Sequence, residues 1–497
     1  MKRWISAVLA VLLYVLAAAP AFGEVSEDMA ALVDRYIEGQ IREGQIPGLA
    51  LAIVRDGKTE YVKGYGVSEG KRPVTPSTPF YICSVGKTFT ALAVRQLAGE
   101  GKLGYDAPVT DYIPWFTLAD PEAARLITIA NLLSHTSGLS TADGLAPWTY
   151  NTAYSIEEAV RRLSRVSPVR KPGLLEEYSN LDYIILGLVV EKASGMAYGE
   201  YIQRFIFDRL GMSHSFTDPE AAKADGLAPG HMVVYGLTLT TRLPLPRAQV
   251  PAGFQMSSAE DMAKFAALYL TNGYAGGQSV FMGNELPEAR APMADNADGL
   301  RYGIYFTLES GEPAGRLGYG GHLGASSDYT SALLISPRRH TAVVVLANCN
   351  NGFTRPAVSA HTIANALCAL LETGEAPEIV SLNRSEKTLS FVILALALLF
   401  IAYRAFRVRP FIRAVNKGRA RKALAVSAYI LEGAASAVLL IAPLLLFDVR
   451  WAYLFNSNPE MWVPVLLTGW SLLCVFFIKT YLLIRNEAKK TQGKGVN

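Results

Sequence analysis

The sequence predicts an α/β domain with an antiparallel sheet built from both ends of the domain, a large and mostly helical insert, and three membrane helices after it. Strand-like runs stand near the two ends of residues 24–375, and helical segments fill the chain between them. Three long apolar runs follow within residues 388–497. These observations divide the chain into an exported domain and a membrane domain.

The first two strands are predicted by β-rich runs at 48–54 and 59–66, which flank an Asp-Gly turn, a strong hairpin signal. Further strands are expected at 301–309, 315–319, 328–335 and 341–347. Apolar residues at helical spacing predict the flanking and inserted helices. These helices are 26–44, 88–99, 155–165, 181–194, 198–210, 258–271 and 355–371.

The N-terminus has the layout of a secretory signal peptide. Lys2 and Arg3 precede an apolar run, 5–19, and small residues follow at 21–23. This layout predicts a signal peptide over 1–23, and the alternative is an uncleaved membrane anchor.

The C-terminal part is predicted to be a membrane domain, 388–497, joined to the exported domain by a linker at 376–387. Its three apolar runs are 388–403, 424–447 and 461–484. Residues 404–422 contain eight Lys and Arg and no acidic residue, and the tail after residue 484 contains four more. The positive-inside rule therefore places this loop and the C-terminus in the cytoplasm. We expect a multi-pass cell-membrane protein that contacts membrane lipid and carries its exported domain outside.

The exported domain is acidic, because residues 24–375 hold 29 Lys and Arg against 37 Asp and Glu, a net charge of −8. Such a domain is a poor candidate for nucleic-acid binding. Four cysteines are too few for a disulfide scaffold, and whether Cys349 and Cys368 pair stays open. The six histidines show no metal-ligand spacing, so no metal or cofactor is expected. Nothing in the sequence indicates an oligomeric state.

Ser84 and Lys87 stand in an apolar segment at the start of the helix expected at 88–99. Residues three apart share one face of a helix, so the lysine lies within reach of the serine hydroxyl. Desolvation favours a neutral lysine, which can accept the serine proton and activate the nucleophile. A second Ser-x-x-Lys sequence, Ser68 to Lys71, lies in a polar turn and is interpreted as a solvated loop.

Two later motifs offer partners for Ser84. Tyr178 lies in a loop before a helix and can relay a proton to a leaving group, while Asn180 can orient a substrate carbonyl and the lysine. The third motif is Gly320-Gly321-His322-Leu323-Gly324, whose glycines allow close approach of a substrate. The N–H of Ala325, with that of Ser84, can form an oxyanion hole.

In this order, S-x-x-K, Y-x-N and H-x-G resemble the motifs of the serine β-lactamase and penicillin-binding-protein superfamily. The resemblance is closest to the class C β-lactamase-like branch, with its esterases and D-amino-acid peptidases, and covers about residues 26–372. It implies a β-lactamase-like fold, and it implies that His135 and Ser137 are structural. Supporting stretches are 127–139, 172–195, 210–212 and 251–262.

The third motif departs from the K-T-G common in this superfamily. His322 gives a weaker, pH-dependent positive charge, and Leu323 lacks a hydroxyl that would hold a carboxylate. Both changes favour a peptidase or esterase over a β-lactamase. The layout of the chain resembles membrane-bound peptidases that remove an acylated D-amino-acid leader from secreted precursors. Tyr81 and Ser326 stand where those enzymes carry acidic and amide groups.

We therefore expect a membrane-anchored serine hydrolase that acts through an acyl-enzyme on small-molecule or peptide substrates. Cell-wall-type or D-amino-acid-containing substrates, including a secreted precursor, are favoured. A β-lactamase is one alternative. Another is a non-catalytic module that binds cell-wall fragments and signals through its spans. Glu432 and Lys479 fall inside predicted spans and could pair. The favoured interpretation is that Lys479 snorkels to the membrane surface and Glu432 makes one structural bond, rather than that the two serve transport.

Overall fold

The structure is a computed structural model, and the predicted signal peptide, 1–23, lies outside the residues that it describes. The described residues are 27–241, 245–271, 273–275, 278–279, 292–295, 301–303, 307–308, 317–350, 358–380, 384–415, 419–446 and 459–492.

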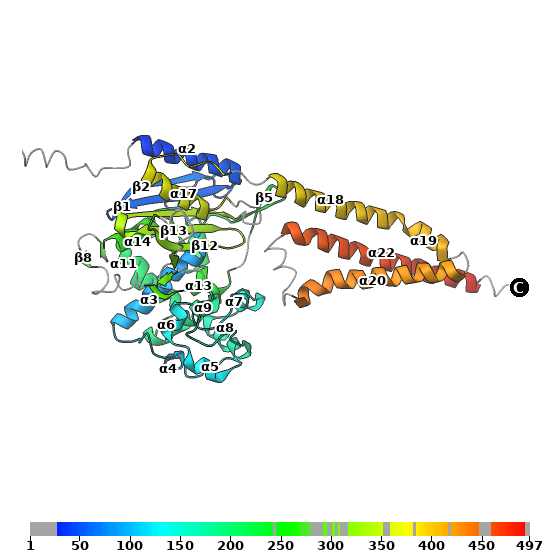
Figure 1. The fold of residues 1–497 in the computed structure, drawn as a ribbon, viewed down its shortest axis with the longest axis horizontal. Coiled ribbons are helices and arrows are strands. Elements are labelled where there is room, and N and C mark those ends of the chain that lie inside the picture. The colour runs from blue at the N-terminus through cyan, green and yellow to red at the C-terminus, as the bar shows by residue number, and fades with distance from the viewer. Residues whose placement is uncertain are drawn as a thin grey trace, which may run out of the picture.

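An eight-stranded antiparallel sheet forms the centre of the domain (Figure 1). β1 pairs with β14 so that Leu49 lies opposite Ala347, which joins the N-terminal and C-terminal parts of the domain as predicted. The strand order is β2 (Lys58–Gly66), β1 (Gly48–Arg55), β14 (Thr341–Ala347), β13 (Thr330–Ser336), β12 (Gly320–Ala325), β11 (Thr307–Leu308), β10 (Arg301–Gly303) and β9 (Pro292–Asp295).

Alternate residues of β1 enter two different cores, because successive strand residues point to opposite faces. Leu51 packs in a cluster with α2 (Glu27–Gly44) and α17 (Ala360–Thr373). Ala52 belongs to the cluster that contains α14 (Ala259–Leu270) and the helical region. A strand covered on both faces explains why β1 reads as a continuous apolar run.

The predicted helical insert is confirmed. Its central element is α9 (Asn180–Ser194), in which residues 181–190 are all buried. The other elements of this region are α3 (Lys87–Gly99), α4 (Val109–Tyr112), α5 (Pro121–Leu126), α6 (Ile129–Leu133), α7 (Thr141–Gly144), α8 (Ile156–Arg162), η3 (Leu163–Arg165), α10 (Tyr198–Ile202), α11 (Asp208–Leu210), α12 (Pro219–Ala224) and α13 (Val250–Gly253).

Two local expectations differ from the structure, and one open question is answered. Of the strand expected at 315–319, residues 315 and 316 lie outside the described residues, and the expectation was wrong for 317–319, because Gly318 takes a left-handed turn (φ 79°) and β12 begins only at Gly320. The region expected to hold helices and loops also contains a hairpin, formed by β4 (His231–Val234) and β5 (Leu237–Thr240). Cys349 and Cys368, whose pairing was open, are separate buried thiols.

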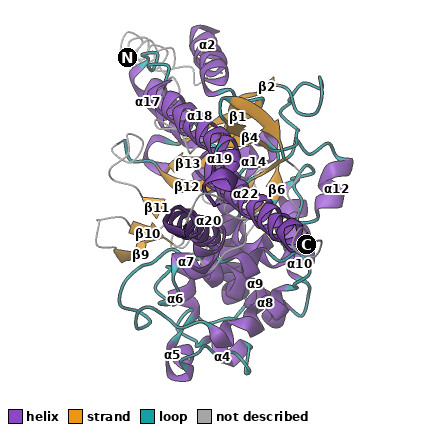
Figure 2. Cartoon of the chain, turned by 90° about the vertical axis from the view of Figure 1, so that its right-hand side faces the viewer, coloured by secondary structure: helices purple, strands orange, loops and turns teal. Residues whose placement is uncertain are grey.

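The C-terminal helices project from one side of the domain in Figure 1, and Figure 2 shows them in front of it. They are α18 (Arg384–Phe406), α19 (Val408–Val415), α20 (Arg419–Leu446) and α22 (Pro459–Gln492). Among the described residues, only Trp462–Arg485 is long and apolar enough to cross a bilayer. Three such helices were expected, and only one meets the criterion of length and composition. The apolar part of α18 is Ser390–Phe406 and that of α20 is Tyr429–Ile441, and both are shorter.

Glu432 and Lys479 form a buried ion pair, so the favoured interpretation of a snorkelling Lys479 was wrong. Lys479 Nζ donates to both carboxylate oxygens of Glu432 at 2.7 Å, and both side chains are buried. Arg404 of α18 also contacts Glu432, so charges from three helices meet at one point. A buried charge of this kind is tolerated because it is paired, and this contact fixes how the helices pack.

Candidate active site

Ser84 lies on a sharp turn where β3 (Phe80–Tyr81) passes into η1 (Cys83–Gly86) and then α3. Cys83 takes a left-handed conformation (φ 48°), unusual for a residue with a side chain. Such a turn leaves Ser84 half-buried at the start of the helical segment. Backbone strain of this type often accompanies a functional side chain.

Lys87 is the first residue of α3 and is only 1 % exposed. Its Nζ donates to Ser84 Oγ at 3.3 Å, to Asn180 Oδ1 at 2.8 Å and to the carbonyl oxygen of Ala252. Burial lowers the pKa of Lys87 from 10.5 to about 7, and the nearby Asp182 would oppose this shift only if it carried a negative charge. A substantial fraction of Lys87 is therefore a neutral amine near neutral pH.

Tyr178 provides the second contact to the nucleophile. Its hydroxyl donates to Ser84 Oγ at 2.7 Å, and its ring centroid lies 4.8 Å from Lys87 Nζ. Asn180 follows as the first residue of α9, whose N-cap, Ser179, accepts a hydrogen bond from the N–H of Leu181. The structure thus brings the first and second sequence motifs together around one oxygen atom.

The third motif lies on β12, which packs against η1. A Cβ added to Gly324 would lie 2.6 Å from the Ile82 carbonyl oxygen and 2.9 Å from Cys83 Cβ. This close approach requires glycine and brings Ala325 beside the segment that carries Ser84.

The register of β12 directs the Ala325 N–H away from β13. The Ser326 N–H donates to the Tyr329 carbonyl at 2.9 Å, and antiparallel pairs alternate between hydrogen-bonded and non-hydrogen-bonded. Ala325, opposite Thr330, is therefore in a non-hydrogen-bonded pair, and its N–H faces the outer edge of β12. On that edge, the described residues pair with β11 only at Gly321.

His322 is buried on β12, and its Nδ1 lies 2.9 Å from the Leu323 carbonyl oxygen. Burial, with a contribution from the Lys87 charge, lowers the pKa of His322 to about 3. The imidazole is therefore neutral over the physiological range. The pH-dependent positive charge expected from the sequence at this position is absent near pH 7.

Comparison with known proteins identifies the family. The profile of the β-lactamase family, described as Beta-lactamase, matches residues 33–367. The chain belongs to the β-lactamase family. Penicillin-binding protein 4 of Amycolatopsis lactamdurans is 30 % identical over 327 residues, which cover 62 % of this chain and 82 % of that protein. Protein flp of Staphylococcus aureus strain N315 is 25 % identical over 391 residues, 78 % of this chain and 76 % of that protein.

Solved structures show the same fold. The octameric penicillin-binding protein homologue from Pyrococcus abyssi matches with a TM-score of 0.60 and 26 % identity, over 71 % of this chain and 79 % of that one. The D-alanine carboxypeptidase AmpC from Burkholderia cenocepacia matches with a TM-score of 0.57 and 22 % identity, over 70 % of this chain and 99 % of that one. Membership of the β-lactamase family makes this chain a serine hydrolase.

One buried acidic residue close to Lys87 was missed from the sequence. Asp182 of α9 is fully buried, accepts a 2.5 Å hydrogen bond from Ser137 Oγ and lies 2.8 Å from His135 Nδ1. The His135 ring in turn packs against the ring of Tyr178, with centroids 4.6 Å apart. An acidic residue within the apolar run of α9 was the available signal. The network supports the prediction that His135 and Ser137 act structurally.

The two positions compared with precursor peptidases lie at the end of β3 and after β12. The Tyr81 ring packs edge-on against Tyr329, with centroids 5.2 Å apart. Ser326 Oγ donates to Asp328 Oδ1 at 3.0 Å. Asp328 therefore places an acidic side chain next to Ser326. The Thr241 hydroxyl also donates to the Asp328 carboxyl at 2.5 Å, and burial raises the pKa of Asp328.

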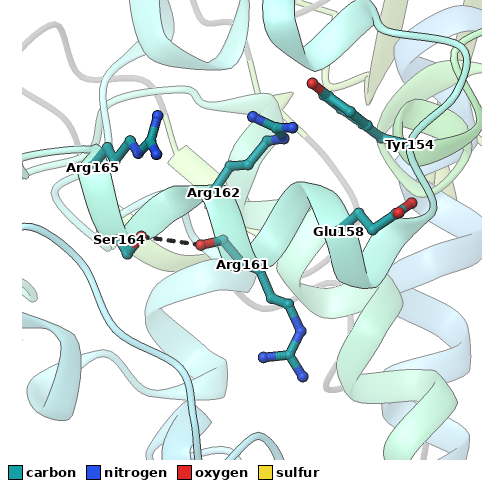
Figure 3. Close-up of a pocket in the computed structure, with 6 residues that line it drawn as sticks. All are labelled: Tyr154, Glu158, Arg161, Arg162, Ser164 and Arg165. Atoms are coloured by element: carbon teal, nitrogen blue, oxygen red, sulfur yellow. Dashed lines mark hydrogen bonds between the residues drawn. The ribbon is translucent and has the colours of Figure 1, made fainter.

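A hollow elsewhere on the surface is separate from this site. It is bordered by Arg162, Arg165 and Tyr154, whose side chains point to one side of the helix in Figure 3, while Arg161 points away. The Arg162 guanidinium stacks on the Tyr154 ring at 4.0 Å. None of Ser84, Lys87 and the other motif residues lines this hollow, so it contributes nothing to the chemistry of Ser84.

The second Ser-x-x-Lys sequence has a different environment. Lys71 is exposed as expected, but Ser68 is buried and its Oγ accepts a 3.1 Å hydrogen bond from Arg72. The description of this segment as a solvated loop was therefore wrong for the serine. Within the described part of the chain, no group of three or more His, Cys, Asp and Glu side chains could hold a metal ion.

Proposed function

We propose that the chain is a membrane-anchored, extracytoplasmic hydrolase that cleaves peptide, amide or ester bonds through an acyl-enzyme on Ser84. The observation that carries this proposal is the placement of Ser84 Oγ between Lys87 Nζ at 3.3 Å and the Tyr178 hydroxyl at 2.7 Å. A pure binding module has no need of a buried, largely desolvated lysine beside a serine. The arrangement matches an activated nucleophile with its base and proton relay.

In the proposed reaction, neutral Lys87 accepts the Ser84 proton as Oγ bonds to the substrate carbonyl carbon. The negative charge on the carbonyl oxygen is stabilised by the N–H groups of Ser84 and Ala325. Tyr178 donates its proton to the leaving group as the scissile bond breaks, and it recovers a proton from Lys87. Water then attacks the acyl carbon, neutral Lys87 takes the water proton and passes it to Ser84 Oγ as the ester bond breaks, and the acid is released. Asn180 holds Lys87 in place through their 2.8 Å hydrogen bond.

The third motif supports a substrate without a free carboxylate beside the scissile bond. His322 is neutral and Leu323 has no hydroxyl, so neither residue of the third motif supplies a charged or hydroxyl contact for a carboxylate. We propose a peptidase or esterase of the class C-like branch, acting on cell-wall-type or D-amino-acid-containing substrates. The fold shared with the D-alanine carboxypeptidase AmpC supports the class C-like branch.

Replacing His322 with lysine is expected to create a preference for substrates with a free carboxylate. A charge-assisted hydrogen bond stabilises such a substrate, so H322K should raise kcat/KM for an acyl-D-Ala-D-Ala free acid relative to its amide by about tenfold. The measurement is the ratio of the two kcat/KM values for wild type and variant. A wild-type enzyme that already favours the free acid strongly would contradict the proposed substrate class.

We further propose that α18 and α20 cross the membrane together with α22. The three helices run in alternating directions in Figure 1, and α19, the start of α20 and the last turns of α22 lie at the end far from the domain. Large apolar side chains are exposed along them. Examples are Leu396, Leu399, Leu431, Val438, Phe477 and Ile484. A bilayer would cover these side chains, and the basic residues at 404–422 would face the cytoplasm.

Intact-mass spectrometry of the full chain in detergent tests the proposed function. Incubation with a penicillin or an activated ester should add one acyl group to the wild type and none to Ser84→Ala. Ser68→Ala is the matched control, because it removes the serine of the other Ser-x-x-Lys sequence, and it should acylate normally. A folded wild-type protein that forms no adduct and turns over neither reagent, yet binds muropeptides, would favour the non-catalytic binding module instead.

A further inference from the structure

The hairpin of β4 and β5 exposes two leucines on one edge. Its turn residues, Tyr235 and Gly236, are both left-handed (φ 49° and 71°), which suits a two-residue hairpin turn. β5 is the outermost strand of a three-stranded sheet with order β15-β4-β5, where β15 is Cys349–Asn350. On β5, Leu237 is 64 % exposed and Leu239 is 47 % exposed.

These leucines share one face of the strand, because residues two apart point the same way. Thr238, which lies between them, points to the other side, where its hydroxyl donates to the Gln45 carbonyl at 3.4 Å. Gln45 Nε2 also donates to the Gly236 carbonyl at 3.0 Å. The hairpin is therefore fixed to the domain, and the leucines form its unsupported outer face.

The tip of the hairpin contacts the first membrane helix. The Tyr235 and Phe391 rings pack with centroids 5.7 Å apart, and Figure 1 shows β5 beside the beginning of α18. Phe391 is the second residue of the apolar segment Ser390–Phe406. The hairpin tip thus lies at the level where this helix becomes apolar, which is where tyrosine is enriched at membrane interfaces.

We propose that the β4–β5 hairpin is a membrane-contacting element that seats the hydrolase domain on the outer leaflet. Leu237 and Leu239 enter the boundary between headgroups and acyl chains, and Tyr235 lies at headgroup level. This inference rests on the proposed membrane anchoring by α18. An exposed apolar edge strand invites aggregation in water, and lipid is the covering that the adjoining helix supplies. The domain is acidic, so apolar insertion suits its contact with anionic lipid better than charge attraction.

Depth measurements on spin-labelled full chain in nanodiscs test this proposal. Cys474 is replaced by serine, and the three other native thiols, which are buried, do not label. Nitroxides are attached to cysteines that replace Leu239, Thr238, Leu396 of α18 and Leu126 of α5, the last as an exposed site distant from α18 in Figure 1. Collisions with oxygen report lipid, and collisions with a water-soluble nickel chelate report solvent.

The labels at Leu239 and Leu396 are expected to favour oxygen, and those at Thr238 and Leu126 to favour nickel. Accessibility that alternates between positions 238 and 239 supports a hairpin with one face in lipid. If Leu396 favours oxygen while Leu239 matches Leu126, the hairpin proposal is overturned and the anchoring stands. If Leu396 also favours nickel, the anchoring itself fails and the hairpin proposal falls with it. Penicillin acylation of each variant verifies that its domain is folded.

Discussion

Replacing Lys87 with methionine is expected to reduce the acylation rate by roughly 10³-fold, the contribution typical of a positioned general base. Methionine fills a similar volume but cannot accept the Ser84 proton. In the wild type, the acylation rate should rise with pH through about 7, because the neutral amine is the base and burial sets its pKa near that value. Stopped-flow acylation with a chromogenic substrate between pH 5 and 9 measures both effects.

The same variant is expected to be more stable than the wild type. Burial lowers the pKa of Lys87 from 10.5 to about 7, so between these values the unfolded chain binds a proton that the folded chain does not. The free energy of unfolding of the wild type should therefore rise with pH between about 7 and 10.5. Below pH 7, the folded protein still contains a buried charged lysine, which lowers that free energy in full. K87M removes that cost, on the order of a few kcal/mol, and its Tm should exceed the wild-type Tm most clearly below pH 7.

Lys71→Met is the matched control for this experiment. Lys71 is exposed and belongs to the other Ser-x-x-Lys sequence, so its replacement should leave both the acylation rate and the Tm unchanged. A K87M protein that acylates at the wild-type rate would remove Lys87 from the proposed mechanism. A wild-type rate independent of pH between 5 and 9 would contradict a base with a pKa near 7.

The local chemistry of Ser84 could be predicted because it depends on short spacing in the chain. The separation of Ser84 and Lys87 is fixed by helical geometry, and the structure places their side chains 3.3 Å apart. The order of the three motifs along the chain indicated the family. The contact between Tyr178 and Ser84 joins residues 94 positions apart, so no local spacing predicts its distance.

The elements that were missed depend on tertiary contacts or on glycine. β12 reads poorly as a strand because three of its six residues are glycine, and it forms because β13 and η1 pack against it. β4 lacks the alternation of a half-buried strand because it is buried throughout, whereas β5 alternates leucine and threonine over Leu237–Thr240 and was overlooked because it is only four residues long. The direction of the Ala325 N–H follows only from register, which the sequence does not specify.

Replacing Asp182 with alanine is expected to destabilise the domain by about 2–4 kcal/mol, because Ser137 and His135 would lose a buried partner. Activity should also fall by tenfold or more, since the His135 ring packs against Tyr178. Thermal unfolding and kcat/KM measure the two effects. A loss of stability without loss of activity would show that this network does not position Tyr178.

Replacing Asp182 with asparagine is expected to leave stability and activity close to those of the wild type. The Ser179 N–H donates to His135 Nδ1 at 3.2 Å, so this nitrogen carries no proton. The proton in the 2.8 Å contact between His135 and Asp182 then belongs to the carboxyl group, whose pKa burial raises well above its usual value. In D182N, the amide N–H replaces that donor and the amide oxygen still accepts from Ser137.

If D182N is as damaged as D182A, the carboxylate charge is required and the neutral assignment is wrong. A stable, active D182N with an unchanged pH midpoint means that Lys87 is tuned by its burial and not by a charge on Asp182.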